Sequence, residues 1–371
     1  MSRWEFVAAW LLLACGGRSS DEVPLAGASG AGAGGEASAG GEAAAPGVAG
    51  EAGGVGCGAD CALTWPGSND VRELSTPELP LGNVSGVTYD SEEGALWVVV
   101  NIPGRLYRLV PQGDGFAPDA RDGWSEGKLL HFPGGMGLAD AEGVTFGASA
   151  ASGLYVASEH DNTAASISRL SVLHYDPSED GDGLSATREW DVTSALPAVR
   201  ANQGIEAITF VPDELLRGAL HDENLDKRYE PRDYPAHGGG LFVVGVEATG
   251  ALHGFALNHD DGTFAKVFEL STPLPGVMSL EHDRETGYLW FGCDDACGNR
   301  LGVLRLGSDG RFALAGLFRA PDALPNSNHE GIALGAEADC QAGEKPIIWV
   351  DDDALDGVTL RRGHVPCGDF L

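Results

Sequence analysis

The strongest constraint on the fold is a repeat that runs from about residue 69 to the end of the chain. Each unit opens with a small residue and β-branched neighbours, and a second apolar run with an aromatic residue follows. The opening runs are SGVTYD at 85–90, EGVTF at 142–146, EAITF at 206–210, MSLEHD at 278–283 and EGIAL at 330–334. The aromatic residues are Trp97, Tyr155, Phe242, Trp290 and Trp349. This order, found five times, predicts one structural unit repeated around a centre.

Further short strands follow in each unit, joined by turns rich in Asp and Gly. In the third unit, for example, ALHGFALN and FAKVFEL flank an HDDG turn. Alternating strands joined by such turns are typical of antiparallel hairpins. Four strands per unit therefore predict an all-β protein, a β-propeller of about five blades, with six blades as the alternative. The 55 glycines and three methionines agree with turns and short strands rather than long helices.

The ring is expected to close through its N-terminal strand. The fifth unit ends at TLRRGHV without a fourth strand, whereas VRELSTPEL at 71–79 echoes VFELSTPL at 267–274. We therefore expect residues 71–79 to complete the last blade, because closure removes the exposed edges that invite aggregation. An insertion at 213–239 follows the first strand of unit three, and we expect it to be structural.

The residues before the repeat predict export and a tether. Residues 1–15 hold an apolar stretch too short to span a bilayer, which is typical of a signal peptide. The stretch ends in LLAC, which resembles the lipobox of bacterial lipoproteins, so Cys15 is the expected lipidation site; an ordinary signal peptide is the alternative. Residues 16–68 are rich in Gly and Ala and predict a flexible tether. Residues 69–371 would then form a propeller domain in the periplasm or at the cell surface, anchored to the membrane by lipid.

The cysteines agree with an exported protein. Without Cys15, six of the seven cysteines remain, an even number that suits disulfides in an oxidising compartment. The expected pairs are Cys57–Cys61, Cys293–Cys297 and Cys340–Cys367. A four-thiolate zinc site built from the two close pairs is the alternative.

Acidic residues gather where a propeller would bind a ligand. The formal net charge of −32 excludes nucleic-acid partners and favours cations. The loops that enter the innermost strands and those that leave the second strands open on one face. The inner ring on this face is Ser85, Glu142, Glu206, Met278 and Glu330, with Asp140 and His329 beside it. The outer ring is Asn101, Glu159, His160, Asp161, Glu247, Asp294, Asp295, Asp351, Asp352 and Asp353.

The three inner-ring glutamates are the candidate metal ligands. Like charges that converge on a narrow channel raise one another's pKa unless a cation lies between them. Carboxylate oxygens select hard cations, and a wide ring suits the six to eight ligands of calcium, so we expect one calcium ion at Glu142, Glu206 and Glu330. For the other acids, the alternative is that they cap strand ends or face water. For His160 and His329, the alternative to an acid, base or ligand role is hydrogen bonding to loops.

Common catalytic motifs give no support for a reaction. The sequence contains no GxSxG, HExxH or Walker A pattern. A GxGxxG match lies inside the Gly/Ala tether and is interpreted as chance. The run Asp176–Gly183 is similar to the start of an EF-hand, but Thr187 stands where the final Glu ligand belongs, so we expect a plain hairpin turn.

The repeat units also resemble a known family. SGVTYDSEEGALWVVVNIPGRLYRL, together with DAEGVTF and GLYVASEHDN, looks like the propellers of the SdiA-regulated and phytase-like esterase group. The C-terminal stretch from NHEGIAL to RRGHVPC is similar to the last blade of exported bacterial members. This resemblance implies a propeller and a bound cation, and it says little about a reaction.

Two functions follow from these observations. The first is a non-enzymatic, monomeric envelope module that binds a small anionic ligand or an envelope partner at the acidic mouth. The alternative is a metal-dependent hydrolase of phosphoesters or other esters, in which calcium acts as a Lewis acid. The missing nucleophile and base favour the first, and the clustered carboxylates favour the second.

Overall fold

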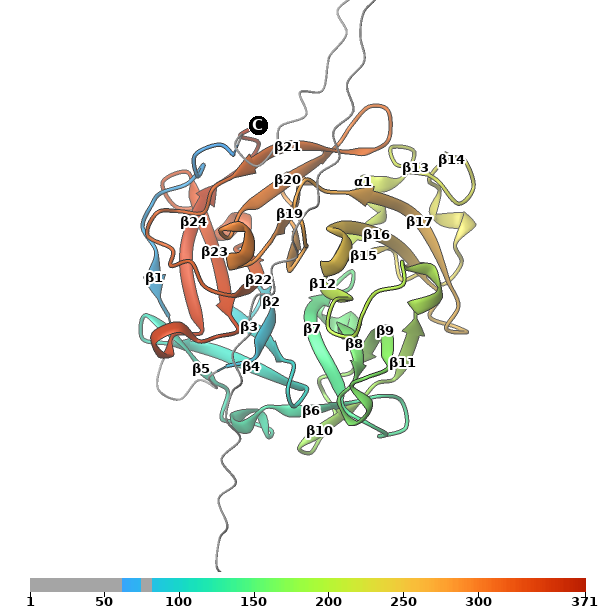
Figure 1. Ribbon diagram of the computed structural model, residues 1–371, viewed down its shortest axis with the longest axis horizontal. Coiled ribbons are helices and arrows are strands. Elements are labelled where there is room, and N and C mark those ends of the chain that lie inside the picture. The colour runs from blue at the N-terminus through green and yellow to red at the C-terminus, as the bar shows by residue number, and fades with distance from the viewer. Residues whose placement is uncertain (1–61, 75–81) are drawn as a thin grey trace, which may run out of the picture. The chain divides into compact units, whose positions relative to one another are not determined.

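The computed structural model describes residues 62–74 and 82–371, and these residues form a five-bladed β-propeller (Figure 1). The prediction of an all-β propeller is confirmed, with five blades rather than six. The described residues all belong to one compact unit. Within the described residues, no helix is long and apolar enough to cross a membrane.

Each blade is an antiparallel sheet whose first strand lies nearest the axis, as Figure 1 shows for β2, β7, β12 and β22. The strands of the blades, in order from the axis outward, have the following bounds. Blade one has β2 (Val84–Asp90), β3 (Ala95–Val100), β4 (Arg105–Gln112) and β6 (Lys128–His131); blade two has β7 (Ala139–Phe146), β8 (Leu154–Asp161), β9 (Ser168–Tyr175) and β11 (Arg188–Asp191); blade three has β12 (Ile205–Pro212), β15 (Gly240–Val246), β16 (Ala251–Leu257) and β17 (Phe264–Ser271); blade four has β18 (Ser279–His282), β19 (Leu289–Gly292), β20 (Leu301–Leu306) and β21 (Phe312–Phe318); blade five has β22 (His329–Leu334), β23 (Glu344–Asp351), β24 (Leu360–Pro366) and β1 (Arg72–Glu73).

Blade one departs from this pattern at its outer edge. Strand β5 (Gly115–Pro118) pairs with one half of β4, and β6 pairs with the other half. Strand β10 (Gly183–Ser185), which follows the EF-hand-like run, then adds to β6 in parallel. That run is therefore more than a plain hairpin turn, because the segment leaving it joins the neighbouring blade.

The insertion in blade three forms its own small structure. It contains helix α1 (Asp213–Leu216) and the hairpin of β13 (His221–Asp222) and β14 (Lys227–Arg228). Buried polar groups hold it together: the Tyr229 hydroxyl donates to Asp213 at 2.8 Å, and the Tyr234 hydroxyl donates to Asp222 at 2.7 Å. The hydrogen bonding and burial of these groups agree with the structural role expected for residues 213–239.

The N-terminal strand closes the ring as the sequence predicts. Strand β1 pairs antiparallel with β24, so that Arg72 lies opposite Arg362 and Glu73 opposite Arg361. The strand is shorter than the predicted 71–79, and residues 75–81 lie outside the described part. Residues assigned to the tether also contribute to the propeller: Trp65 is buried between Trp290 and Trp349, with centroid separations of 6.3 and 5.8 Å.

Five hydrophobic clusters, one between each pair of neighbouring blades, form the core. In blade one, successive side chains of a strand point to opposite faces and pack into two different clusters. On β3, Val98 packs toward blade five, whereas Trp97 and Val99 pack toward blade two. Both faces of each blade are thereby covered, which explains why its central strands are continuous apolar runs.

Small residues let the innermost strands approach closely around the axis. A Cβ atom added at Gly86 would lie 2.7 Å from the carbonyl oxygen of Glu142, and one at Gly143 would lie 2.9 Å from the backbone nitrogen of Ile208. At Gly331 it would lie 2.9 Å from the carbonyl oxygen of Ser85. Atoms cannot approach that closely, so the small residue that opens these repeat units is a packing requirement of the narrow channel.

Two of the three expected disulfides lie in the described residues, and both are present. Cys293–Cys297 joins residues 4 apart in sequence, and Cys340–Cys367 joins residues 27 apart. The latter links the loop between β22 and β23 to the end of β24, within the blade that closes the ring. Cys57 and Cys61 lie outside the described residues.

The chain-entropy model predicts that these two disulfides stabilise the fold by different amounts, because they close loops of different length. Replacing Cys340 and Cys367 with serine should lower the free energy of unfolding by roughly 3 kcal/mol, because the bond closes the longer loop. Replacing Cys293 and Cys297 with serine is the matched control and should cost about half as much. Urea unfolding of both double variants under non-reducing conditions measures the difference. Equal losses would contradict the loop-length argument.

Candidate functional site

The inner-ring residues project into the channel because β-bulges lie at their positions. The pairing of β2 with β3 shifts between Val84 and Gly86, which leaves Ser85 as the extra residue. Equivalent shifts leave Glu142, Glu206 and Glu330 as extra residues in the pairings of their strands. A bulge re-aims a side chain, and here it directs four residues of different blades toward the axis.

The structure brings the inner ring together as the repeat predicts. Ser85, Glu142, Glu206, Met278 and Glu330 all line one cavity of about 10 Å³, together with the residues that follow them on each strand. That volume accommodates about one water molecule or ion. The described residues that line the cavity include no Lys or Arg, so the carboxylates face one another without a protein cation.

Burial and mutual repulsion make these carboxylates hard to ionise. Burial raises the pKa of Glu142 well above its usual range, and Asp140 and Glu330 raise it further. Burial, followed by the charges of Glu142 and Glu159, does the same to the pKa of Glu206. Burial and then Asp352 raise the pKa of Glu330 to about 8. A cation in the channel would reverse these shifts, because it stabilises the ionised form.

Several buried polar atoms of the mouth have no protein partner for a hydrogen bond. In the inner ring these atoms are Ser85 Oγ and Glu330 Oε2. Around it they are Asn101 Oδ1, Asp140 Oδ1, His160 Nδ1, His329 Nε2 and Asp352 Oδ1. Buried polar groups are normally paired, so a group of unpaired oxygens beside a carboxylate ring fits the donor set of a hard cation.

A second polar cluster lies beside the ring, between β7 and β8. One ligand-type atom each of Asp140, Glu159 and His160 lies within 4.8 Å of the other two. Each of these three residues is only 2% exposed. Sequence reasoning placed Glu159 and His160 in the outer ring and Asp140 beside the inner one. It did not group them, because their proximity depends on bulges in both strands.

Other outer-ring acids have structural partners. Asp351 accepts hydrogen bonds from Ser327 at 2.8 Å and from Arg361 Nη1 at 2.6 Å. Asp161 accepts from the backbone of Thr163 at 2.9 Å and from its hydroxyl at 2.8 Å. Asp294 caps a short turn by accepting from the backbone nitrogen of Ala296 at 3.0 Å. For these acids, the alternative of capping and loop support fits the structure.

Glu247 and His329 are two further residues of the predicted mouth. Burial, then the charges of Glu159 and Asp294, raise the pKa of Glu247 to about 6. His329 Nδ1 lies 3.2 Å from Asn299 Oδ1 and 3.0 Å from the carbonyl oxygen of Ser327. His329 thus bonds to loops.

The first half of the propeller matches the model of a known protein family. Residues 79–232 match a family model described as "Phytase-like: Esterase-like activity of phytase". The resemblance to phytase-like propellers is confirmed over this stretch. It contains Glu142 and Glu206, and it ends before Glu330. The match does not extend to the name SdiA-regulated, which stays a prediction.

Other comparisons add little to the phytase-like match. No curated protein matches the sequence. Among solved structures, a chain in "Crystal structure of Nidogen/Laminin Complex" is similar at 9% sequence identity and a TM-score of 0.36. That similarity covers 76% of this chain and 84% of the other, and it carries no argument about function.

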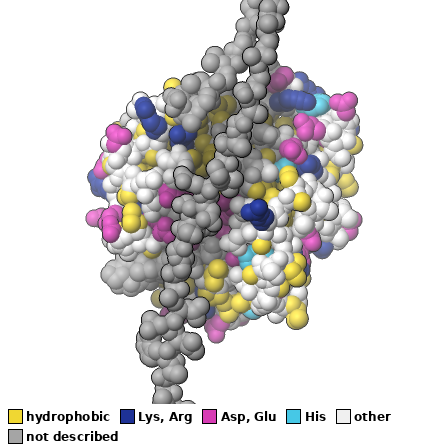
Figure 2. All heavy atoms as spheres, in the orientation of Figure 1, with side chains coloured by type: hydrophobic (Ala, Val, Ile, Leu, Met, Phe, Trp, Pro, Cys, Tyr) yellow, Lys and Arg dark blue, Asp and Glu magenta, His cyan; other side chains and the backbone are white. Residues whose placement is uncertain are grey.

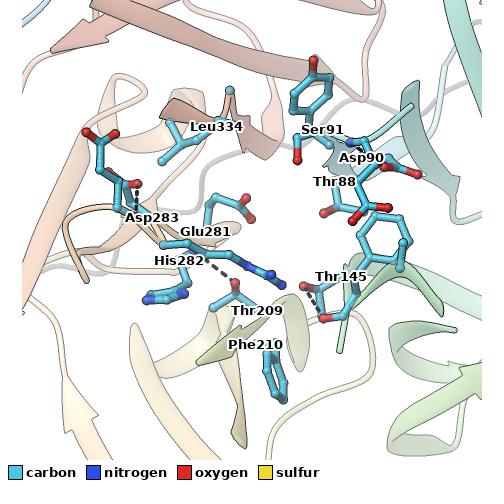
Figure 3. Close-up of a pocket in the computed structure, with 18 of the residues that line it drawn as sticks. Thr88, Asp90, Ser91, Thr145, Thr209, Phe210, Glu281, His282, Asp283 and Leu334 are labelled. Atoms are coloured by element: carbon cyan, nitrogen blue, oxygen red, sulfur yellow. Dashed lines mark hydrogen bonds between the residues drawn. The ribbon is translucent and has the colours of Figure 1, made fainter. Parts of the chain in front are cut away.

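A larger pocket of about 380 Å³ lies at the other end of the inner strands. Figure 3 shows Glu281 pointing into the space between Thr88, Thr145 and Thr209. These four residues each stand three positions after an inner-ring residue, so the repeat places them at one level of the channel. Sequence reasoning missed this level, although the register that identified the inner ring could have revealed it.

Acidic side chains also lie on the outer surface, where several blades carry them on the face shown in Figure 2. The surplus of acid is therefore not confined to the mouth. What separates the inner ring from this surface charge is burial, since Glu142 is 4% exposed and Glu206 is 7% exposed.

Glu281 should make stability depend on pH. Burial raises its pKa from about 4.5 to about 8, with Arg284 opposing the rise. Between these values the unfolded chain loses a proton that the folded protein keeps, so stability falls as pH increases. The free energy of unfolding of Glu281→Gln, relative to wild type, should therefore gain little at pH 4.5 and roughly 4 kcal/mol at pH 8. Urea unfolding across this range measures the gain, and a pH-independent difference would show that Glu281 is ionised in the folded protein.

Proposed function

We propose that this protein is a ligand-binding β-propeller whose mouth holds one calcium ion at Glu142, Glu206 and Glu330. The observation that carries the proposal is the meeting of three carboxylates from three blades in one cavity with room for a single ion. Glu142 and Glu206 are buried, and Glu330 is half-buried. Without a cation, each carboxylate must either take up a proton or repel its neighbours. With calcium, all three can be ionised and bound.

The donor set supports calcium over a softer metal. The ring offers carboxylate oxygens and the hydroxyl of Ser85, which has no hydrogen-bond partner in the structure. Hard oxygen donors of this kind are typical of calcium and magnesium sites. Ligands contributed by separate blades form a ring of adjustable width, which suits the variable geometry of calcium better than the strict octahedron of magnesium.

Calcium would also define what the mouth binds. An acidic mouth repels anions, but a bound divalent cation reverses the local charge and can orient a carboxylate or a phosphate. The ion-binding groups are buried while the surrounding outer-ring residues lie at the mouth, which suits recognition of a small anionic ligand or of an acidic group on an envelope partner. We propose binding without catalysis, because no nucleophile paired with a base accompanies the ring in the described residues.

Ester hydrolysis is the second candidate. The description of the matching family, "Esterase-like activity of phytase", favours it, and two of the three ring glutamates lie in the matched stretch. In this case calcium would polarise a phosphoryl or acyl oxygen of the substrate. A release assay with phosphate and aryl esters, in calcium and in chelator, separates the two candidates. Calcium-dependent release that disappears in Glu206→Gln would establish hydrolysis and overturn the non-enzymatic proposal.

The calcium site predicts two opposite effects of Glu206→Gln. In chelator, the variant should unfold at a higher temperature than wild type, because it removes a buried carboxylate from a repulsive cluster. In calcium, only the wild-type protein should become much more stable. Its free energy of unfolding should rise by about 2.7 kcal/mol when calcium is in hundredfold excess over the dissociation constant. Calorimetric melting curves measure both effects.

The matched control for this prediction lies in the same channel. Glu281→Gln makes the same substitution at the other end of the inner strands and should keep the full response to calcium. If calcium shifts the midpoint of neither wild type nor the control, the channel does not bind calcium. If Glu206→Gln responds like wild type, the ion binds elsewhere.

We also propose that the propeller is exported and tethered by lipid at Cys15. The support is the lipobox-like end of residues 1–15, followed by a segment in which 29 of the 41 residues from 16 to 56 are Gly, Ala or Ser. Disulfides in the folded part agree with an oxidising compartment. These first residues lie outside the described part of the structure.

Cys15→Ser should move the protein from the membrane fraction to the soluble fraction, because the thiol that carries the lipid is lost. Fractionation of bacteria that express each form, followed by mass analysis of the N-terminal peptide, measures this. Cys340→Ser is a control that removes a cysteine without affecting the anchor. Unchanged membrane association of Cys15→Ser, with no lipid on the wild-type peptide, would contradict the proposal.

A further inference from the structure

The cluster of Asp140, Glu159 and His160 differs in kind from the carboxylate ring beside it. It combines two carboxylates with an imidazole, and one ligand-type atom of each lies within 4.8 Å of the others. All three side chains are nearly inaccessible to solvent, with 2% exposure each. Groups this polar are not normally buried together unless they pair with one another or with an ion.

The groups pair with one another only in part. His160 Nδ1 lies 2.9 Å from Asp140 Oδ2, which is close enough for a hydrogen bond. Even so, His160 Nδ1 has no hydrogen-bond partner, and neither has Asp140 Oδ1. An imidazole nitrogen and carboxylate oxygens this close together, with Asp140 Oδ1 left without a hydrogen-bond partner, have the spacing that ligands of one ion require.

The backbone supports the same arrangement. Asp140 lies at a shift in the pairing of β7 with β8, and Glu159 lies at a shift in the pairing of β8 with β9. One oxygen of Glu159, Oε1, accepts a hydrogen bond from the backbone nitrogen of Gly204, which fixes the carboxylate. Such support of a ligand by a neighbouring group is typical of metal sites.

We infer that Asp140, Glu159 and His160 form a second metal site, which binds a borderline divalent ion such as Zn²⁺ rather than calcium. The inference follows from the ligand set: an imidazole nitrogen with carboxylate oxygens suits zinc and its transition-metal neighbours, whereas calcium takes oxygen ligands. Three protein ligands leave a tetrahedral ion one open position for water or a ligand. The site uses none of the three ring glutamates, so the two sites have different ligands.

Cobalt is the probe that tests this site. Co²⁺ takes the place of zinc in such sites and absorbs visible light with an intensity that reports its coordination. Metal-stripped wild-type protein, titrated with Co²⁺ in the presence of saturating calcium, should show one equivalent of a four- or five-coordinate ion. Adding Zn²⁺ should remove the absorption, because both ions use the same ligands.

Variants separate this site from the ring. His160→Ala should weaken cobalt binding by at least about tenfold and leave the response of the melting temperature to calcium intact. Asp140→Asn keeps the shape of the side chain and should weaken cobalt binding in the same way, which covers the case that His160→Ala does not fold. His282→Ala is the matched control, because His282 is also buried, at 5% exposure, and lies at the other end of the channel.

Each outcome decides the inference. Loss of cobalt binding in His160→Ala and Asp140→Asn, with binding retained in His282→Ala and in Glu330→Gln, supports a separate site. Cobalt binding that survives both His160→Ala and Asp140→Asn overturns it, as does cobalt that calcium displaces in full. Loss of the calcium response in Glu330→Gln alone bears only on the ring, so failure of the calcium proposal remains distinguishable.

Discussion

Five inner strands that meet around a narrow axis are the constraint on which the rest of this structure depends. Their backbones approach so closely that a Cβ atom at Gly86 would lie 2.7 Å from the carbonyl oxygen of Glu142. Only glycine fits at Gly86, and the equivalent positions of the other units carry glycine, alanine or serine, so a small residue there is a condition for closing the ring. The five apolar clusters between blades then hold the strands at this distance.

The close approach of the inner strands also concentrates negative charge in the channel. The bulges that accompany the small residues turn Glu142, Glu206 and Glu330 toward a cavity of about 10 Å³. Packing favours the closed ring, and repulsion between buried carboxylates opposes it. A bound cation resolves this conflict without loosening the packing, because it lets all three groups ionise in place. The channel therefore combines closely packed inner strands with the strongest candidate for ion binding.

The mouth and the opposite end of the channel have different chemistry on the same strands. At the mouth, buried oxygens without partners surround the inner ring, and the cluster of Asp140, Glu159 and His160 adds a nitrogen donor. Three positions further along each strand, Thr88, Thr145 and Thr209 surround Glu281, whose pKa is raised to about 8. A five-fold repeat with substitutions at single positions can thus give its two ends different ligands.

The sequence by itself determined the architecture, because the repeat of a small residue, β-branched residues and an aromatic is a local pattern. It predicted about five blades, with six as the alternative, and a closing strand within residues 71–79, of which the structure shows Arg72–Glu73. It also predicted the bonds Cys293–Cys297 and Cys340–Cys367 and the convergence of the inner ring, which the structure contains. The structure decided which acids are buried together. Asp351 and Asp161 belong to the same outer ring as Glu159, yet these two accept hydrogen bonds from neighbouring groups. Whether an acid pairs with Arg361 or faces His160 depends on bulges and on contacts between strands, which spacing along the chain does not encode.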